Sequence, residues 1–211
     1  MYKDFESANN THCKVPNVFP SISASIGNYE PQSTIWKTAI YIHAPIRFYI
    51  LYLRWKYYRS VIHENCYVIV KLAVFLNIIE NLALLGLTNW TSSKNYSYHE
   101  ISFKMFIGTS VFYMLFTCIM LTKYRRRPNI THRERHSVKL KWRAFIVNVA
   151  SFASAAYFFL RHNRLCEPYV YSMFGLSEYI VVISNIVFHL TTAYDLQINF
   201  ICLTNKGLTT E

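Results

Sequence analysis

Apolar residues gather in five long runs along this chain, and short polar segments separate the runs. A transmembrane helix needs about 20 mainly apolar residues, and each run comes close to that length. Almost nothing between the runs has the polar and apolar faces of a soluble surface helix. The pattern predicts an all-α, polytopic membrane helical bundle with about five transmembrane helices. The predicted spans are roughly 35–53, 66–87, 103–121, 144–160 and 169–190.

Composition supports a membrane protein rather than a soluble one. Of the 211 residues, 53% are hydrophobic and only 16% are charged, whereas charged residues make up about a quarter of a soluble domain. No internal repeat stands out. The expected organisation is an N-terminal segment at 1–33, a transmembrane bundle at 34–192 and a tail at 193–211.

The placement of positive charge predicts the orientation. Segment 123–143, "KYRRRPNITHRERHSVKLKWR", holds nine Lys or Arg residues, and Arg54, Lys56 and Arg59 follow the first run. Because basic loops stay in the cytosol, the N-terminal segment is expected to be lumenal and the C-terminal tail cytosolic. The net charge of +11 is therefore explained by topology and by contact with anionic membrane lipids. No nucleic-acid partner is expected, because no aromatic platform or known module accompanies the basic loop.

Two cysteines, Cys13 and Cys166, fall on the lumenal side of this topology. Cysteines in an oxidising compartment commonly pair, so a disulfide between them is one interpretation and two free thiols are the other. The chain has no CxxC motif and no Cys/His zinc spacing. No metal site is therefore expected.

Three ionisable residues, His43, Glu80 and Glu178, interrupt the apolar runs. Counted along the helices, all three lie roughly 10–14 Å below the predicted lumenal surface. Such residues are costly inside a bilayer and usually functional. The residues expected to share their helical faces are Arg47, Asn77, Asn81, Asn185 and His189.

Two interpretations of this layer stay open. It can line a polar pocket in the lumenal half of the bundle, or a Glu80–Arg47 pair can simply set the register of the helices. The predicted lumenal loop "RHNRLCEP" adds Arg161, His162 and Arg164 at the mouth of the layer. Its arginines can hold a phosphate group or be solvated loop charges.

Several blocks of the sequence resemble a known family. They are "THCKVPNVFPSISASIG", "NIIENLALL", "YHE" and "RHNRLCEPYVYSMFGLSEYIVVISNIVFHLT", in this order. They resemble the post-GPI-attachment factor two family, within a wider group that includes lysosomal damage-regulated autophagy modulators and yeast cell-wall proteins. The resemblance runs from about Thr11 to Asp195.

The resemblance implies a multi-pass protein of the Golgi apparatus or endoplasmic reticulum membrane that acts in GPI-anchor lipid remodelling. The implied step is reacylation of lyso-GPI-anchored proteins with a saturated chain at sn-2. The implied partners are GPI-anchored proteins, their lipid anchors, membrane lipids and other GPI-remodelling proteins. No bound cofactor is expected, and the acyl donor can be acyl-CoA or a phospholipid. Family members usually have an extra span before the THC block, so a shortened isoform and an incomplete gene product both stay open.

Acyl transfer needs a base for the lipid hydroxyl and donors for the oxyanion. His43, oriented by Glu80 or Glu178, is a candidate base, and His162 is the alternative. Arg47 or an Asn amide is a candidate oxyanion donor. Two rival functions stay open: an accessory protein that presents lyso-GPI to an enzyme, and a lipid or ion transporter, although the chain lacks the repeat symmetry typical of transporters.

The predicted orientation can be tested at the sequon of Asn129, which lies in the basic segment. Because glycans are added only on the lumenal side of the membrane, Asn129 is expected to carry none. Glycosidase digestion and mass mapping of the protein from cells measure this. A glycan on Asn129 would contradict the orientation.

Overall fold

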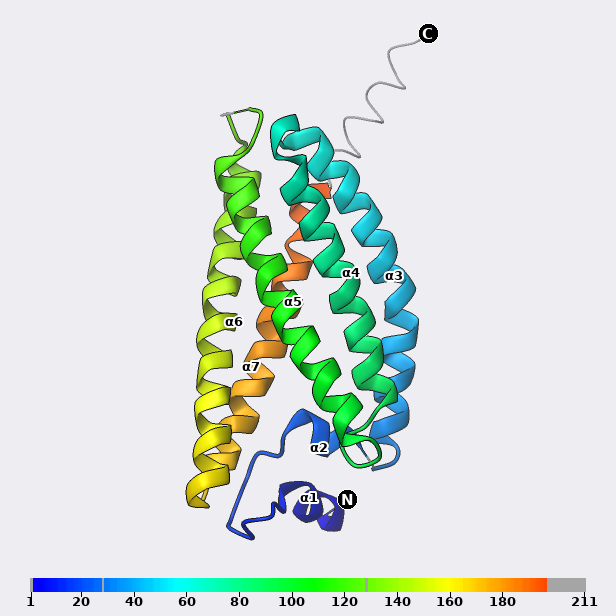
Figure 1. Ribbon diagram of the computed structural model, residues 1–211, viewed down its shortest axis with the longest axis vertical. Coiled ribbons are helices and arrows are strands. Elements are labelled where there is room, and N and C mark those ends of the chain that lie inside the picture. The colour runs from blue at the N-terminus through cyan, green and yellow to red at the C-terminus, as the bar shows by residue number, and fades with distance from the viewer. Residues whose placement is uncertain (1, 28, 128, 197–211) are drawn as a thin grey trace.

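The computed structural model describes residues 2–27, 29–127 and 129–196. Helices make up the fold, and no β-strand forms within these ranges (Figure 1). The predicted tail from residue 197 onward lies outside the described residues. The helices are α1 Tyr2–Asn9, α2 Ile22–Gly27, α3 Gln32–Val61, the 3₁₀ turn η1 Glu64–Cys66, α4 Tyr67–Asn89, α5 Tyr96–Lys123, α6 His132–Leu165 and α7 Val170–Leu190.

Within the described ranges, four helical segments are long and apolar enough to cross a membrane: Glu64–Asn89, Tyr96–Lys123, His132–Leu165 and Val170–Leu196. They confirm the predicted all-α, multi-pass bundle. The first predicted span, 35–53, lies in α3, which has 30 residues and is about 45 Å long. Although α3 is long, it is not apolar enough to count among these four segments. Two of its polar residues, Arg47 and Arg54, point into the bundle and are hydrogen-bonded there.

Helix α6 extends at both ends beyond the apolar run that predicted it. The basic segment 123–143 was expected to be a loop, but α6 begins at His132. The Thr131 side chain caps this helix in a capping box with Glu134, which also pairs with Arg125. Capping stabilises a helix start whatever the hydropathy of the residues. At its other end α6 runs to Leu165, so the expected loop 161–168 is helical over its first half.

Packing inside the bundle forms three apolar layers. Tyr58, Ile62 and Leu121 belong to the layer at one end, and Tyr113 and Phe188 belong to the central one. The third layer is built around Ala83, Phe106, Ile107 and Val181. Large apolar side chains also cover the outside, as lipid contact requires. They include Phe75, Leu82, Ile146, Leu160 and Ile183.

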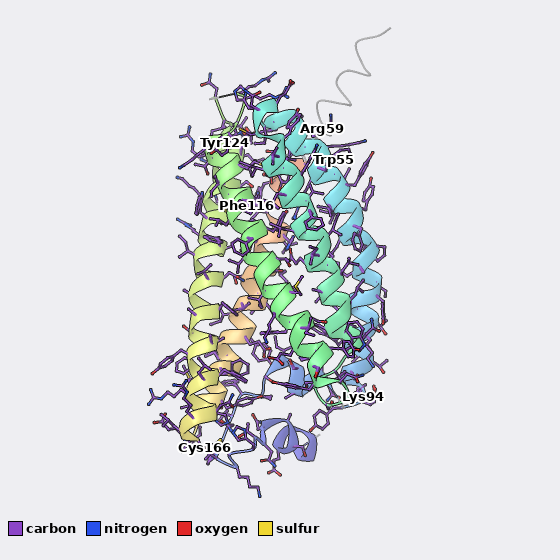
Figure 2. All side chains as sticks on the ribbon, viewed as in Figure 1. Trp55, Arg59, Lys94, Phe116, Tyr124 and Cys166 are labelled. Atoms are coloured by element: carbon purple, nitrogen blue, oxygen red, sulfur yellow. A yellow bond between two sulfur atoms is a disulfide. The ribbon has the colours of Figure 1, made fainter. Side chains whose placement is uncertain are left out.

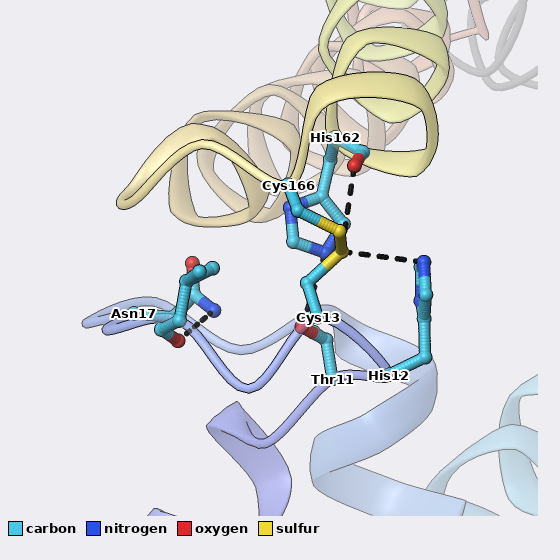
Figure 3. The surroundings of a disulfide bond; sticks show 7 residues. Thr11, His12, Cys13, Asn17, His162 and Cys166 are labelled. Atoms are coloured by element: carbon cyan, nitrogen blue, oxygen red, sulfur yellow. Dashed lines mark hydrogen bonds between the residues drawn. A yellow bond between two sulfur atoms is a disulfide. The ribbon is translucent and has the colours of Figure 1, made fainter.

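The N-terminal segment folds across one end of the bundle, where α1 and α2 lie beside the α4–α5 and α6–α7 connections (Figure 1). A disulfide joins Cys13 to Cys166, with 2.04 Å between the sulfurs (Figure 3). Thr11 Oγ1 lies 3.0 Å from His162 Nε2, and the backbone N–H of Tyr169 donates to the carbonyl of Pro16. The stretch 11–16 is therefore fastened to the α6–α7 connection.

The two ends of the bundle differ in character. Cys166 and Lys94 lie at the end that carries the N-terminal segment, and Trp55, Arg59 and Tyr124 lie at the other end (Figure 2). The disulfide and Arg59, in the last turn of α3, are thus at opposite ends of the bundle, as the predicted orientation requires. Which end faces the lumen stays a prediction.

Loss of the disulfide is expected to loosen the N-terminal segment. The bond spans 153 residues, and removing a natural disulfide typically costs about 2–4 kcal/mol. Cys13→Ser should therefore lower the unfolding temperature of the purified protein and speed trypsin cleavage after Lys14. Cys66→Ser, which removes a free thiol, is the control. Equal protease resistance in Cys13→Ser and wild type would show that the disulfide does not hold the segment.

Candidate functional site

A mostly apolar cavity of about 260 Å³ lies beneath α2 and opens among α3, α4, α5 and α7. Aromatic and aliphatic side chains form its walls, among them Phe103, Phe106, Phe152, Phe174 and Val181. A few polar groups interrupt this lining. They are Ser23, Ser33, Lys37, His43, Arg47, Thr88, Thr91, Ser92, His99, Glu178 and Asn185.

A second cavity of about 410 Å³ adjoins the first and lies between α2, α5, α6 and α7. The two cavities share part of their walls, so we describe them as two lobes of one space. The first lobe reaches toward Arg47, and the second runs beside Phe159 and Tyr171. The shared residues are Ser23, Ser92, His99, Phe103, Phe152, Ala155, Phe174 and Glu178.

Helix α2 covers this space and is held on one side by α7. Ser172 Oγ accepts hydrogen bonds from the backbone N–H groups of Val18 (2.7 Å) and Phe19 (3.2 Å). One turn further along, a side chain on Gly175 would meet the carbonyl oxygen of Phe19 at 2.9 Å, so only glycine allows this approach. After another turn, Glu178 Oε2 accepts from the N–H of Ile22 at 2.8 Å. Glu178 therefore caps α2 as well as lining both lobes.

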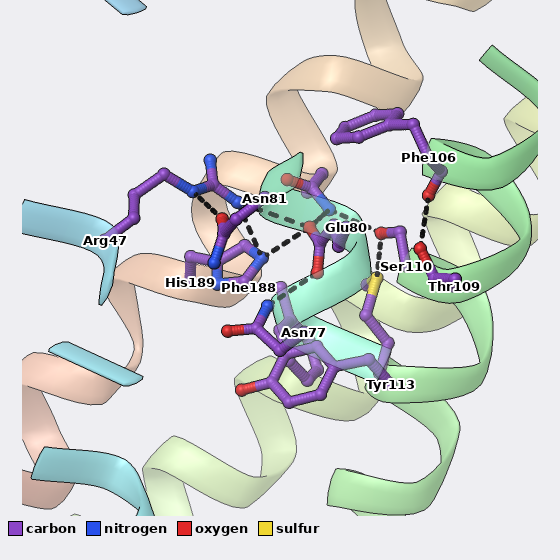
Figure 4. A network of polar contacts seen from close by, with 12 residues as sticks. Arg47, Asn77, Glu80, Asn81, Phe106, Thr109, Ser110, Tyr113, Phe188 and His189 are labelled. Carbon is purple, nitrogen blue, oxygen red and sulfur yellow. Dashed lines mark hydrogen bonds and ion pairs between the residues drawn. The ribbon is translucent and has the colours of Figure 1, made fainter. Parts of the chain in front are cut away.

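Glu80 lies deeper in the bundle, fully buried, at the centre of a network that joins α3, α4 and α7 (Figure 4). Its Oε1 accepts from His189 Nε2 (2.9 Å), Asn185 Nδ2 (3.1 Å) and Arg47 Nη2 (3.3 Å). Its Oε2 accepts from Asn77 Nδ2 at 2.7 Å. Four donors thus compensate one carboxylate, as a buried charge requires.

The network continues toward the other end of the bundle through His189. Arg54 Nη1 lies 2.9 Å from His189 Nδ1. Because a guanidinium can only donate, Nδ1 accepts and the Nε2–H donates to Glu80. Arg54 also binds Tyr113, Thr192 and the carbonyl of His189. Arg47 is therefore tied to the Glu80 carboxylate directly, and Arg54 is tied to it through an intervening imidazole.

A separate buried cluster joins α6 to the residues that follow α7. Lys141 Nζ lies 2.6 Å from Asp195 Oδ2, and Ser137 Oγ donates to Asp195 Oδ1 at 2.7 Å. Lys141 Nζ also donates to Ser137 Oγ at 2.7 Å. All three side chains are buried. The sequence analysis did not predict this cluster, because Ser137 and Lys141 fall in the segment 123–143 that was expected to be a loop.

Four of the residues expected at the site line the cavity: His43, Arg47, Glu178 and Asn185. Glu80 was expected to line it too, but Glu80 lies behind its wall together with Asn77, Asn81 and His189.

The expected single layer of His43, Glu80 and Glu178 also needs correction. Glu80 contacts Asn185 and His189, which lie seven and eleven residues beyond Glu178 on α7. At 1.5 Å per residue the offset is about 10–16 Å. The α6–α7 connection projects further along the bundle than the α4–α5 connection (Figure 1). The predicted depths of Glu80 and Glu178 were each counted from the end of their own helix, so equal counts do not place the two residues at the same level. In the described part of the chain, no hydrogen bond joins His43 to Glu80 or Glu178.

The three residues of the expected mouth lie away from the cavity. Arg161 donates to Glu167 at 2.5 and 3.0 Å and to Tyr157 at 2.9 Å. Its hydrogen bonds hold the pKa of Glu167 below the usual value for a glutamate. Arg164 is exposed, and His162 is buried beside the disulfide (Figure 3). Arg161 therefore fastens the α6–α7 connection, and His162 contacts the N-terminal segment at Thr11.

Among the residues that the structure describes, one group of possible metal ligands occurs, and it lies near the disulfide. The ligand atoms of His12, Cys13 and His162 lie within 4.8 Å of one another. Zinc binds cysteine as a thiolate, but the sulfur of Cys13 is bonded to Cys166. The cluster therefore offers two imidazoles as ligands. The two histidines fit a structural role beside the disulfide better than a role in a metal centre.

Comparison with known proteins gives consistent matches along the chain. The profile of the Frag1/DRAM/Sfk1/Cwh43P N-terminal domain matches residues 1–198. The chain is 42% identical to Post-GPI attachment to proteins factor 2 of Drosophila pseudoobscura pseudoobscura, over 97% of this chain and 80% of the relative. It is 36% identical to the protein of the same name from Caenorhabditis elegans, over 96% and 79%.

A vertebrate relative carries a different name. The chain is 37% identical to Acyltransferase PGAP2 of Xenopus tropicalis, over 91% of this chain and 77% of the relative. No solved structure matches the chain. The helical bundle, the family profile and the identities over nearly the whole chain lead to one conclusion: this chain belongs to the Post-GPI attachment to proteins factor 2 family, within the Frag1/DRAM/Sfk1/Cwh43P group.

Proposed function

We propose that this protein acts in GPI-anchor remodelling as an acyltransferase, which reacylates lyso-GPI-anchored proteins with a saturated chain at sn-2. The observation that carries the proposal is the two-lobed apolar cavity beneath α2, at the end of the bundle expected to be lumenal. A GPI anchor lies in the lumenal leaflet, so its glycerol can reach this end. Two relatives, from frog and zebrafish, are named acyltransferases. We place the activity in the Golgi membrane, with the endoplasmic reticulum as the alternative.

Positive charge along the first lobe suits the phosphodiester of the anchor. Lys37 and Arg47 both line this lobe. Arg47 donates through Nε to Asn81 and through Nη2 to Glu80, which leaves Nη1 for an oxygen of the substrate. A guanidinium positioned in this way forms strong, directional bonds to phosphate oxygens. His43, one turn along α3 from Arg47, lines the same lobe and contacts the substrate headgroup in this proposal.

Glu80 has a positioning role in the proposed site. Four protein donors bind its two carboxylate oxygens, and its side chain does not line the cavity. It holds Arg47 at the end of the first lobe and supplies the negative charge that Arg47 and Arg54 need inside the bundle. Asn185 contacts both Glu80 and the cavity and links the two.

Reconstitution tests the proposed activity directly. The purified chain in liposomes with a lyso-GPI-anchored protein should form a two-chain anchor with palmitoyl-CoA or with a saturated phospholipid as the donor. Ala155→Phe enlarges a side chain in the wall that the two lobes share and so narrows the cavity. A steric misfit in an apolar substrate pocket typically costs about 1–3 kcal/mol of transition-state binding, so transfer should fall roughly ten- to a hundredfold. Mass spectrometry of the anchor measures the product.

The matched control is Ala153→Phe on the same helix. Ala153 is exposed and lines neither lobe, so this variant should transfer at the wild-type rate. If the wild-type protein binds the lysolipid but forms no product with either donor, the acyltransferase proposal is wrong and the accessory function is favoured.

The role of Glu80 makes a separate prediction about stability. Glu80→Gln keeps the shape of the side chain but removes the charge that compensates Arg47. Breaking a buried ion pair at one partner typically costs about 3–5 kcal/mol, so the unfolding temperature should fall sharply. Arg47→Gln combined with Glu80→Gln should cost less than the sum of the two single changes. Thermal unfolding in detergent micelles measures both effects.

Glu100→Gln is the matched control, because Glu100 pairs with Lys104 on the surface of α5. Exposed pairs contribute at most about 1 kcal/mol, so this variant should unfold near the wild-type temperature. A Glu80→Gln protein that unfolds like wild type would contradict the role of Glu80 in stability, whether or not acyl transfer is lost.

A further inference from the structure

Ser23 and His99 meet on the wall that the two lobes share. Ser23 lies on α2 and His99 lies on α5, 76 residues apart in sequence. The Nε2 atom of His99 is 3.2 Å from the hydroxyl oxygen of Ser23. Both residues line both lobes. A serine hydroxyl and an imidazole are therefore within hydrogen-bond reach of each other where two bound hydrocarbon chains would converge.

The other ring nitrogen of His99 determines which way this hydrogen bond runs. Nδ1 lies 2.8 Å from the carbonyl oxygen of Trp90. A carbonyl oxygen can only accept, so Nδ1 carries the proton and donates to Trp90. Nε2 is left with its lone pair and accepts from the O–H of Ser23. The order Ser23, His99, Trp90 carbonyl is that of a nucleophile, its base and the group that orients the base.

We propose that Ser23 is the nucleophile and His99 the general base of a double-displacement acyl transfer, with an acyl-Ser23 ester as the intermediate. This inference rests on the proposed acyltransferase function and adds its chemistry. It also gives a role to the "YHE" and "SISASIG" stretches, which no other part of the proposed site uses. The Trp90 carbonyl is the positioning group.

The proposed steps balance in atoms and charge. Ser23 Oγ attacks the carbonyl carbon of the donor, a thioester or a glycerol ester, and its proton passes to His99 Nε2. The tetrahedral intermediate collapses to acyl-Ser23, and the leaving thiol or alcohol takes the proton from Nε2. The free hydroxyl of the lysolipid then attacks the Ser23 ester and gives its proton to Nε2. The new lipid ester forms as Ser23 leaves and recovers the proton.

The shape of the cavity supports two successive transfers at one serine. One lobe can hold the chain already on the lysolipid while the other holds the incoming chain, and only the shared wall is open to both. Holding two reactants at one point makes a large part of the rate acceleration of many enzymes. The contacts of Ser172, Gly175 and Glu178 fix α2 to α7, so Ser23 is presented to His99 by a fastened segment.

The experiment measures the acyl-enzyme itself, without lyso-GPI. The full chain in liposomes is incubated with labelled palmitoyl-CoA or with a labelled saturated phospholipid, and the protein is mapped by mass spectrometry. The expected result is one palmitoyl group on the Ser23 peptide. Ser23→Ala should lose the label, and His99→Ala should lower its rate of formation about 100- to 10,000-fold, the range typical of general bases. Ser25→Ala, two residues away and lining neither lobe, should be labelled like wild type.

Ser23→Cys keeps a nucleophile at the same position and guards against loss of folding. Its acyl group should be a thioester that neutral hydroxylamine releases, whereas the wild-type oxyester should resist hydroxylamine. Wild-type acyl transfer to lyso-GPI by Ser23→Ala would overturn this inference and leave the proposed function standing. Labelling of Ser23 without transfer to lyso-GPI would support the inference and overturn the proposed acceptor. Absence of both label and transfer in wild type would overturn both.

Discussion

The compensation of one buried carboxylate is the constraint on which the bundle depends. Glu80 is fully buried between apolar helices, where an unpaired charge would be very costly. Donors from α3, α4 and α7 converge on its two oxygens, so the positions of these helices are coupled. The same contacts place the Arg47 side chain at the end of the first lobe. Stability and the placement of a substrate-binding group therefore rest on one network.

The second constraint is covalent and acts at the opposite end of the cavity. The Cys13–Cys166 bond and the contacts of α7 hold a short segment over an apolar space that lipid tails could otherwise enter freely. In the proposed mechanism this cover also carries the nucleophile. A segment with so few apolar contacts of its own needs such fastening, because α2 has only six residues and isolated helices of that length are unstable.

The candidate site could be predicted only in part. The sequence identified Arg47, His43, Glu178 and Asn185, because polar residues inside apolar runs stand out. Depth counting failed for Glu80, since the helix ends are staggered. Charge alone misplaced Arg161, which pairs with Glu167, six residues further along the chain and just beyond the end of α6. Ser23 and His99 gave no signal by themselves, because neither residue type is rare in a loop and they are 76 residues apart.

What the sequence determined by itself is the class of structure and the family. Runs of apolar residues as long as a bilayer is thick allow only membrane-spanning helices, because lipid offers no partners for backbone polar groups. The placement of Cys13 and Cys166 on the same side of the membrane followed from charge placement along the chain, and the disulfide agrees with it. Tertiary structure alone decided which polar groups meet: Glu80 with His189, and Ser23 with His99. Such pairs depend on the stagger and rotation of packed helices, which arise from side-chain packing over the whole bundle and leave no local pattern.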